Sequence, residues 1–281
     1  MYTIEDYQAL KKKYKGNFIL EFGTLPLIIT APHGGWERPS SIPDRVRNGS
    51  LILQDLYTKE IAEDIYSEIT RHYGQSPSVV VNLISRRKAD PNRPLDEGSE
   101  TEKGKKIWLD YHKHIKEAIQ ALHKQHNYGL LIDIHGQKHK HGMVELGYLL
   151  TPDDIKTNDT ETFKQYILQK SSIQSLAHRY PKIEPRQLLC LLGDKISDHH
   201  EVPTMPSSEA EVDDKFYFFG AYTTETYHFY DEKNDKGLDA VQIEIPQKFR
   251  LTSEGRDQVV RAVSKAAIYF LDNYYLNKHK L

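Results

Sequence analysis

The sequence predicts an α/β protein, a three-layer sandwich in which helices cover both faces of a mostly parallel or mixed central sheet. Short apolar runs alternate with long amphipathic segments, which is typical of strands joined by crossover helices. Polar clusters follow several of the apolar runs directly, as they do where a ligand binds at the carboxyl ends of parallel strands. We find no internal repeat and no low-complexity linker, and therefore expect a single domain over residues 1–281.

Short apolar runs predict the strands, because each is rich in β-branched residues and ends in glycine, proline or charged residues. They are Asn17–Phe22, Leu25–Ala31, Val79–Ile84, Leu130–Ile134, Val144–Leu150 and Ala240–Ile245. Apolar side chains spaced three or four residues apart predict helices that pack one face on the sheet. These helices are expected within Asp55–Tyr73, Trp108–Leu122 and Val259–Phe270.

Residues 151–230 are less regular than the rest of the chain. They contain a polar segment that predicts a helix at about Glu161–His178, a proline-rich stretch at Val202–Ser207 and an aromatic patch at Phe216–Phe219. We interpret this stretch as an insertion that covers one end of the sheet and the site, and not as a second domain.

Composition excludes several classes of function. The 38 basic and 40 acidic residues give a net charge of −2, which argues against a broad nucleic-acid-binding face. No apolar run approaches the ~20 residues that a membrane helix needs. The N-terminal residues include acids and no apolar stretch, so we expect no secretory signal. A lone Cys190, which we expect in the core, fits a reducing compartment, and we expect a cytoplasmic protein.

The chain has 14 histidines and one cysteine, so any metal ion must be held by imidazole and carboxylate groups. His33 and His135 are the best candidates, since each lies at the end of an apolar run and precedes glycine. A catalytic zinc ion commonly has two histidines and one carboxylate as protein ligands. The carboxylate could be Glu37, four residues after His33, or Asp55, at the start of the next helix. In the alternative interpretation His33 caps a turn and Asp55 only caps a helix.

Glu244 lies in the last apolar run, where alternation places it on the same face as Gln242. A carboxylate in a buried strand needs a partner or a function. Glu244 is therefore a candidate general base that activates water at the metal ion. The alternative is a solvated glutamate on an edge strand.

A basic cluster follows Val79–Ile84 and contains Arg86, Arg87 and Arg93. These guanidinium groups could hold a substrate carboxylate or stabilise an oxyanion, and the alternative is a set of surface salt bridges. The intervening segment, Asp90–Asn92, predicts a turn.

Several other histidines have simpler interpretations than metal binding. We expect His139 and His141 in a solvated loop, although they could line the mouth of the site. Histidines on or beside the Trp108 helix have lysine neighbours that suggest a solvent-facing side. They are His112, His114, His123 and His126.

Motifs run in order from about residue 27 to residue 250. They are Pro32–Gly35, Ile42–Arg45, Arg86–Arg93, Asp133–Gly136, Glu145–Tyr148 and Gln242–Glu244. Together they resemble the N-formylglutamate amidohydrolase family, which is related in fold to the zinc carboxypeptidases and has a phosphorylase/hydrolase-like core. The resemblance implies a hydrolase with one zinc ion (Zn²⁺) per chain that cleaves the amide of a small acidic N-acyl amino acid.

The resemblance also implies roles for individual residues. His33 and His135 match the metal-binding histidines, and an acid opening the next helix favours Asp55 over Glu37 as third ligand. Glu244 matches the general base. In the substrate-binding part, Asn92 and Arg93 match a pair that grips the substrate carboxylate.

Two assignments are less closely tied to the motifs. Arg86 is the first choice for oxyanion stabilisation, with Arg87 as its alternative. Phe219–Thr224, which contains Tyr222, also resembles a family segment and is expected to form a wall of the pocket.

Two other functions remain open from the sequence. A γ-glutamyl or peptide hydrolase, or a carboxypeptidase, would use the same metal site with a more open cleft. A non-catalytic module for small acidic ligands would keep Arg93 but need no metal. We expect a small anionic amide as the ligand, and neither a nucleic acid nor a membrane as partner. The oligomeric state is not predicted.

Overall fold

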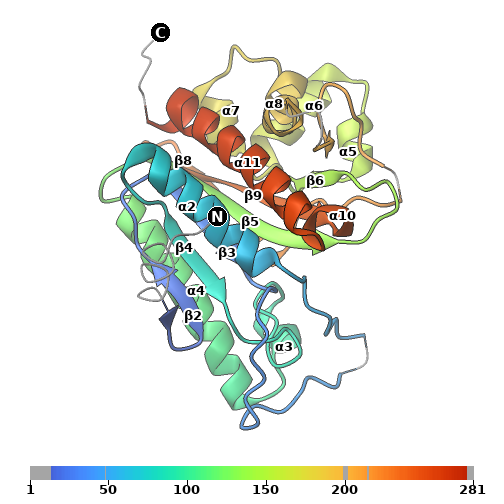
Figure 1. Ribbon diagram of the computed structural model, residues 1–281. Helices are drawn as coiled ribbons and strands as arrows, with labels where there is room; N and C mark the ends of the chain where they lie inside the picture. The colour runs from blue at the N-terminus through green and yellow to red at the C-terminus, as the bar shows by residue number, and fades with distance from the viewer. Residues whose placement is uncertain (1–13, 48, 199–201, 214, 277–281) are drawn as a thin grey trace.

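The structure is a computed structural model, and it describes residues 14–47, 49–198, 202–213 and 215–276. Most of the N-terminal segment used to exclude a secretory signal lies outside these residues. Within the described residues, nine strands form one sheet in the order β1-β2-β4-β3-β5-β9-β6-β7, with β8 paired to β9 (Figure 1). The strands are β1 (Tyr14–Lys15), β2 (Phe18–Glu21), β3 (Leu27–Ala31), β4 (Ser78–Asn82), β5 (Tyr128–Gln137), β6 (Val144–Gly147), β7 (Thr204–Met205), β8 (Phe229–Asp231) and β9 (Lys236–Pro246).

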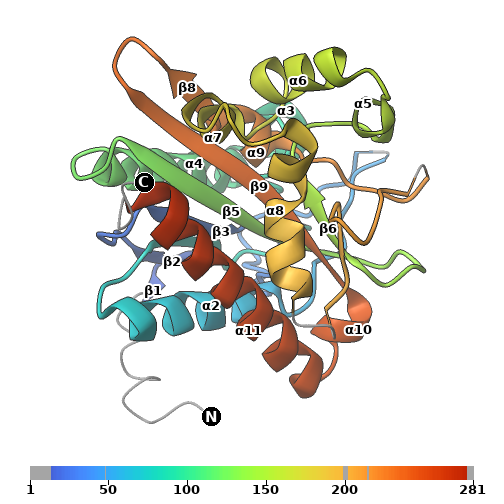
Figure 2. The same ribbon diagram turned by 90° about the horizontal axis from the view of Figure 1, so that it is seen from above.

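Helices cover both faces of this sheet. They are α2 (Thr58–Tyr73), α3 (Leu95–Gly98), α4 (Glu102–Leu122), α5 (Pro152–Lys156), α6 (Thr160–Gln169), α7 (Gln174–Arg179), α8 (Pro185–Ser197), α9 (Tyr222–Tyr227), α10 (Gln247–Arg250) and α11 (Ser253–Phe270), which continues into the π-helical turn η1 (Leu271–Tyr275). α2 and α11 lie on one face and α4 on the other (Figures 1 and 2). The predicted three-layer α/β sandwich with a mixed central sheet is therefore confirmed.

The central strands β4, β3, β5 and β9 are parallel, whereas β2, β6 and β8 each pair antiparallel with one of them. After β3 the chain goes first to β4 on one side and then to β5 on the other. The order therefore reverses between β3 and β5. Ligands of open α/β sheets bind at the carboxyl ends of the strands beside such a reversal.

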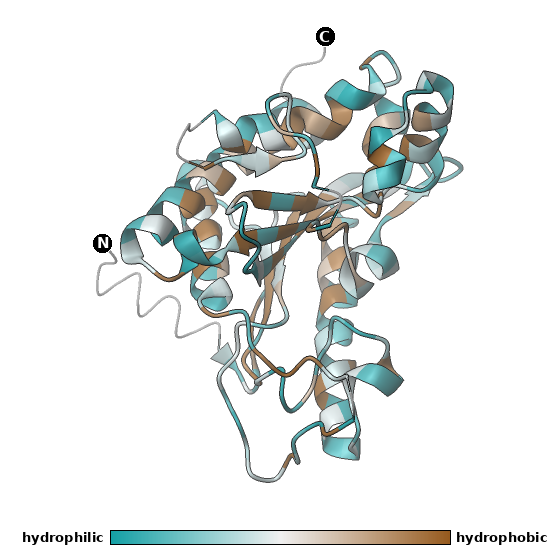
Figure 3. Ribbon diagram, turned by 90° about the vertical axis from the view of Figure 1, so that its right-hand side faces the viewer, coloured by the Kyte–Doolittle hydropathy of each residue, from teal (hydrophilic) through white to brown (hydrophobic). Residues whose placement is uncertain are grey.

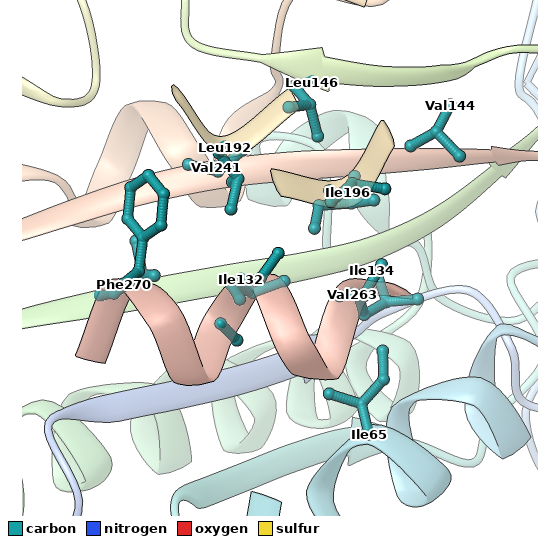
Figure 4. Packing of buried hydrophobic residues seen from close by; sticks show 14 of the residues in the cluster. Ile65, Ile132, Ile134, Val144, Leu146, Leu192, Ile196, Val241, Val263 and Phe270 are labelled. Atoms are coloured by element: carbon teal, nitrogen blue, oxygen red, sulfur yellow. The ribbon is translucent and has the colours of Figure 1, made fainter. Parts of the chain in front are cut away.

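Strand alternation divides the buried residues into two clusters. Ile132, Ile134, Val241 and Ile243 face α2 and α11, and Figure 4 shows Ile132, Ile134 and Val241 among the buried side chains of this cluster, together with Val263 of α11. In Figure 3 the strands and the inward sides of the helices are the hydrophobic parts of the ribbon. Residues at the alternate positions face α4, among them Leu131 and Ala240. By the same alternation, the polar residues that follow on β5 and β9 lie on the α4 side of the sheet.

The expected strands and helices are present, with shifts of a few residues at their ends. The largest error is in the 151–230 insertion, where the expected helix at Glu161–His178 is two helices, α6 and α7. The chain between them docks on β9, because Ser172 accepts a hydrogen bond from the Ala240 N–H and its hydroxyl donates to the Ala240 carbonyl. Ser171 and Ser172 are fully buried by this contact. None of the helices in the described residues has the length and apolarity to cross a membrane.

Candidate metal centre

His33 and His135 meet at the point where the strand order reverses. His33 lies two residues beyond β3, and His135 lies near the end of β5, the strand beside β3. Their ring centroids are 4.9 Å apart with an interplanar angle of 78°. Both side chains are almost fully buried.

Asp55 lies between the two imidazole rings, in the turn that precedes α2. Its backbone N–H donates to the His33 carbonyl at 3.1 Å, which fixes the turn against the loop after β3. One carboxylate oxygen, Oδ2, lies 3.3 Å from His33 Nδ1 and 3.4 Å from His135 Nδ1. The same oxygen accepts the Gly136 N–H at 3.2 Å. His33, Asp55 and His135 thus present their ligand atoms within 4.8 Å of one another.

A buried carboxylate holds the far nitrogen of each ring. His33 Nε2 lies 2.7 Å from Asp90 Oδ1, and His135 Nε2 lies 2.9 Å from Asp133 Oδ2. Asp90 and Asp133 are both fully buried. Burial opposes their ionisation, but the neighbouring histidines hold the pKa of both carboxyl groups below the usual value.

These contacts select one tautomer of each ring. A carboxylate at Nε2 keeps the proton on that nitrogen and leaves Nδ1 to face Asp55. In metalloproteins a ligating histidine commonly donates its other N–H to a carboxylate in this way. Burial opposes the ionisation of Asp55, but hydrogen bonds and charge from the two rings lower its pKa well below the usual range. Burial likewise opposes a charge on His135, but Asp133 and Asp55 raise the pKa of this histidine well above its usual value. A divalent cation can take the place of a proton at Nδ1, so the residues fit a metal ion.

Glu244 is close to this cluster because β9 pairs with β5 and places Glu244 opposite His135. It is 5% exposed, and Gln242 Nε2 donates to its Oε1 at 2.9 Å. Its other oxygen, Oε2, has no hydrogen-bond partner among the residues that the structure describes. Burial and the carboxylates of Asp55 and Glu145 raise the pKa of Glu244 to about 7. Glu244 therefore lies on a central strand, and not on the solvated edge strand of the alternative interpretation.

Glu145 extends this arrangement by one strand. It pairs with Glu244 across β6 and β9, so His135, Glu244 and Glu145 form a row over three neighbouring strands. Glu145 is fully buried, and burial raises its pKa to about 7. His139 and His141 both contact its Oε1. The expectation of a solvated loop for these two histidines is wrong, because their side chains pack against this carboxylate.

The basic cluster after β4 divides into separate environments. Arg86 is buried, donates from Nε to Asp90 Oδ2 at 2.7 Å and lies 3.9 Å from Asp55 Oδ1. Arg87 instead lies 3.7 Å from Asp44, at a partly exposed position. The Arg93 guanidinium has no hydrogen bond or ion pair within the described part of the chain. Arg86 is thus part of the metal-site cluster, and Arg93 is free to meet a ligand.

Asn92 connects the cluster to the 216–224 segment. Its side-chain oxygen accepts the Thr223 N–H at 2.9 Å and the Thr223 hydroxyl at 3.0 Å, and its amide nitrogen lies 3.2 Å from His135 Nε2. These contacts occupy the Asn92 amide inside the protein, which favours a positioning role over direct contact with a substrate. Tyr222, the first residue of α9, packs near Trp108 and His112.

The structure bears on one open alternative and corrects one expectation. Glu37, the other carboxylate that the sequence left open, is exposed and lies outside the group formed by His33, Asp55 and His135, so geometry favours Asp55 as the candidate carboxylate ligand. His112 does not face solvent, since it is buried between the Pro91 carbonyl and the Tyr227 hydroxyl, at 2.8 and 2.7 Å. Burial lowers its pKa to about 4, so His112 is neutral at pH 7.

Sequence reasoning assigned no role to Asp90 and Asp133. A signal existed for Asp133, because residues two apart on a strand share a face and Asp133 stands two before His135. For Asp90 the local sequence predicts only a turn.

Comparison with known proteins identifies the fold. No protein-family model matches the chain, and no curated protein matches its sequence. The crystal structure of N-formylglutamate amidohydrolase from Ralstonia eutropha JMP134 matches with a TM-score of 0.55 and 13% identity, over 92% of this chain and 98% of that one. The gene product Atu2144 from Agrobacterium tumefaciens matches with a TM-score of 0.50 and 14% identity, over 92% and 98% of the two chains. The resemblance expected from the motifs is confirmed at the level of the fold.

Proposed function

We propose that this chain is a zinc-dependent amidohydrolase that cleaves the amide bond of an N-acyl acidic amino acid similar to N-formyl-glutamate. The observation that carries the proposal is the convergence of His33, His135 and Asp55 beside the unpartnered oxygen of Glu244. A fold shared with an N-formylglutamate amidohydrolase supports the same reaction class.

His33 Nδ1, His135 Nδ1 and an oxygen of Asp55 would hold the ion, while Asp90 and Asp133 orient the two rings. A bound zinc ion supplies a Lewis acid that polarises the amide carbonyl and makes water more acidic. Two neutral imidazoles and one carboxylate are a donor set that zinc prefers, although other divalent ions of the first transition row also accept it.

Glu244 performs the proton transfers. Its free oxygen accepts the proton from the attacking water, and the protonated carboxyl group then donates it to the departing amine nitrogen. A carboxyl group whose pKa is raised to about 7 by burial and by the neighbouring carboxylates suits both steps at neutral pH.

Two arginine side chains interact with the negative charges of the substrate. Arg86, at the edge of the cluster, stabilises the charge that develops on the carbonyl oxygen. Arg93 binds the substrate carboxylate, since its guanidinium is not used within the described residues. Asn92 fixes the turn that presents Arg93.

The test combines metal analysis with hydrolysis of a panel of N-acyl amino acids and short peptides. The purified chain should contain about one zinc ion and should hydrolyse N-formyl-glutamate or a close relative. E244Q should abolish turnover and keep the metal, whereas H135A should lose the metal. An active E244Q variant would overturn the assignment of the base, and a chain that binds no metal would overturn the proposal as a whole.

A further inference from the structure

A buried carboxylate at the end of the row holds an aromatic surface in place. Glu145 Oε1 lies 2.7 Å from His139 Nδ1 and 3.1 Å from His141 Nε2, and Glu145 Oε2 accepts the Phe218 N–H at 2.7 Å. His141 Nε2 also lies 3.1 Å from the Phe216 carbonyl. Glu145 therefore fixes the 138–141 loop and the 216–218 segment relative to each other.

His139, His141 and Glu145 could be taken for a second metal site, because their ligand atoms lie within 4.8 Å of one another. The backbone argues against this. The Met143 N–H donates to His141 Nδ1 at 3.0 Å, so Nδ1 must carry a lone pair. In the neutral ring the proton is then on Nε2, the atom that would have to bind the metal. His141 therefore donates a hydrogen bond to Glu145. We call Glu145, His139 and His141 the clamp, because their contacts hold the 138–141 loop and the 216–218 segment together.

The clamp presents aromatic rings to solvent. Phe218 stacks on His139 with centroids 4.7 Å apart and an interplanar angle of 22°, and Phe216 lies 5.4 Å from the same imidazole. Phe216 and Phe218 are 48% and 44% exposed. Single exposed phenylalanines are ordinary, but here a buried carboxylate and two histidines hold adjacent rings in one surface. We call His139, Phe216 and Phe218 the aromatic platform.

The platform lies at one end of the candidate site. Adjacent strands are about 4.8 Å apart, so the row from His135 through Glu244 to Glu145 spans about 10 Å. Arg86 and Arg93 lie after β4, on the opposite side of the metal ligands from β6. The site is therefore asymmetric, with guanidinium groups at one end, the metal ligands and Glu244 in the middle, and exposed rings at the other.

We infer that the aromatic platform binds the acyl group of the substrate, and that this group is apolar and planar, such as an arylalkanoyl chain. The inference rests on the proposed function. With the substrate carboxylate at Arg93 and the amide at Glu244, the acyl group points towards β6. A formyl group is too short to cross the gap of about 5 Å between β9 and β6, and it would leave the platform empty.

The experiment compares N-formyl-, N-acetyl- and N-phenylacetyl-glutamate in the zinc-loaded chain, the F216A/F218A double variant and the F22A control. Phe22 is 43% exposed, much like the platform rings, but it follows β2, which lies beyond β4 and away from β6. We expect kcat/KM to be highest for the phenylacetyl substrate. The double variant should lose about tenfold more on this substrate than on the formyl substrate, while F22A keeps the parental ratio. Thermal melts verify that the variants are folded.

A binding measurement separates this inference from the proposed function. In the zinc-loaded E244Q variant, calorimetry should show phenylacetyl-glutamate binding about tenfold more tightly than acetyl-glutamate, a preference that F216A/F218A removes. If the chain hydrolyses N-acyl-glutamates but the double variant slows all three substrates equally, the inference about the aromatic platform is wrong and the proposed function stands. If no substrate is hydrolysed but the chain prefers phenylacetyl-glutamate and F216A/F218A removes this preference, the proposed function is wrong and the inference about the platform stands.

Discussion

The D133N substitution tests the histidine tautomer on which the proposed metal centre depends. Asp133 is fully buried, its Oδ1 accepts the Thr30 hydroxyl at 2.6 Å, and its Oδ2 holds the His135 Nε2 proton. Asparagine has the same shape and can still accept from Thr30. However, the new amide nitrogen faces His135 as a donor, and the Asn92 amide nitrogen already lies 3.2 Å from the same atom. Both donors favour a lone pair on Nε2 and therefore a proton on Nδ1.

A proton on Nδ1 competes directly with the metal ion. Loss of an outer hydrogen-bond partner of a metal-ligating histidine typically lowers metal affinity about 10- to 100-fold. This corresponds to about 1.4–2.7 kcal/mol of binding free energy. We expect D133N to lie at the upper end of this range, because the substitution changes the tautomer as well as the charge. The affinity is measured by competition with a chromophoric chelator at pH 7.

Another buried aspartate provides the control. Asp239 on β9 is also fully buried and bonds to the Leu176 N–H, Arg179 and Tyr275 instead of to the metal cluster. D239N should lower the free energy of unfolding but leave the zinc affinity within about twofold, as expected for a distant, independent site. If D133N binds zinc as tightly as the parent chain, the tautomer assignment is incorrect. If D239N loses as much affinity as D133N, the effect of D133N reflects general destabilisation.

Further predictions follow from the packing and charge of the site. A methyl group at Gly34 would lie 2.4 Å from the Lys59 backbone nitrogen, so G34A should lower the free energy of unfolding by about 1–3 kcal/mol in urea titrations; unchanged stability would show that α2 can shift freely. Because Glu244 must be ionised to accept a proton and its pKa is raised to about 7, kcat/KM should rise with pH through a midpoint near or below 7. E145Q removes one of the charges that raise this pKa and should move the midpoint to lower pH; a move to higher pH contradicts the assignment. Removing zinc should lower stability by about 4 kcal/mol relative to a zinc concentration 1,000 times the dissociation constant, and H135A should show no such zinc-dependent shift in thermal melts.

The elements that the sequence predicted well are those with a strong local pattern. β3, which leads to His33, and β5, which carries His135, were predicted from apolar runs, and glycine follows each histidine. Gly34 lies beyond its strand, whereas Gly136 is still within β5. The two histidines were found because a topological rule places the ends of parallel strands together, whatever the details of packing. The choice of Asp55 as the candidate third ligand needed the family resemblance, because spacing alone left Asp55 and Glu37 open.

The features that sequence reasoning missed depend on register and on long-range contacts. Glu145 lies opposite Glu244 only because β6 runs antiparallel to β9 in one particular register, and no local pattern shows which residues are opposed. Asp90 reaches His33 because the loop after β4 folds back over the sheet edge. His112 was misread from its lysine neighbours, whereas its own face of α4 packs on the Pro91 turn and Tyr227.

The carboxylates of the site differ in how many of their oxygens are already bonded, and this difference separates their roles. Asp90 and Asp133 use both oxygens within the protein, so each can orient a ring but has no free acceptor for a reacting molecule. Both oxygens of Glu145 are likewise occupied by the clamp. Glu244 keeps one buried oxygen without a partner in the described residues, and leaving such an oxygen unbonded costs stability. This oxygen, on the strand beside His135, is the observation behind our proposal that Glu244 is the carboxylate that exchanges a proton with the substrate.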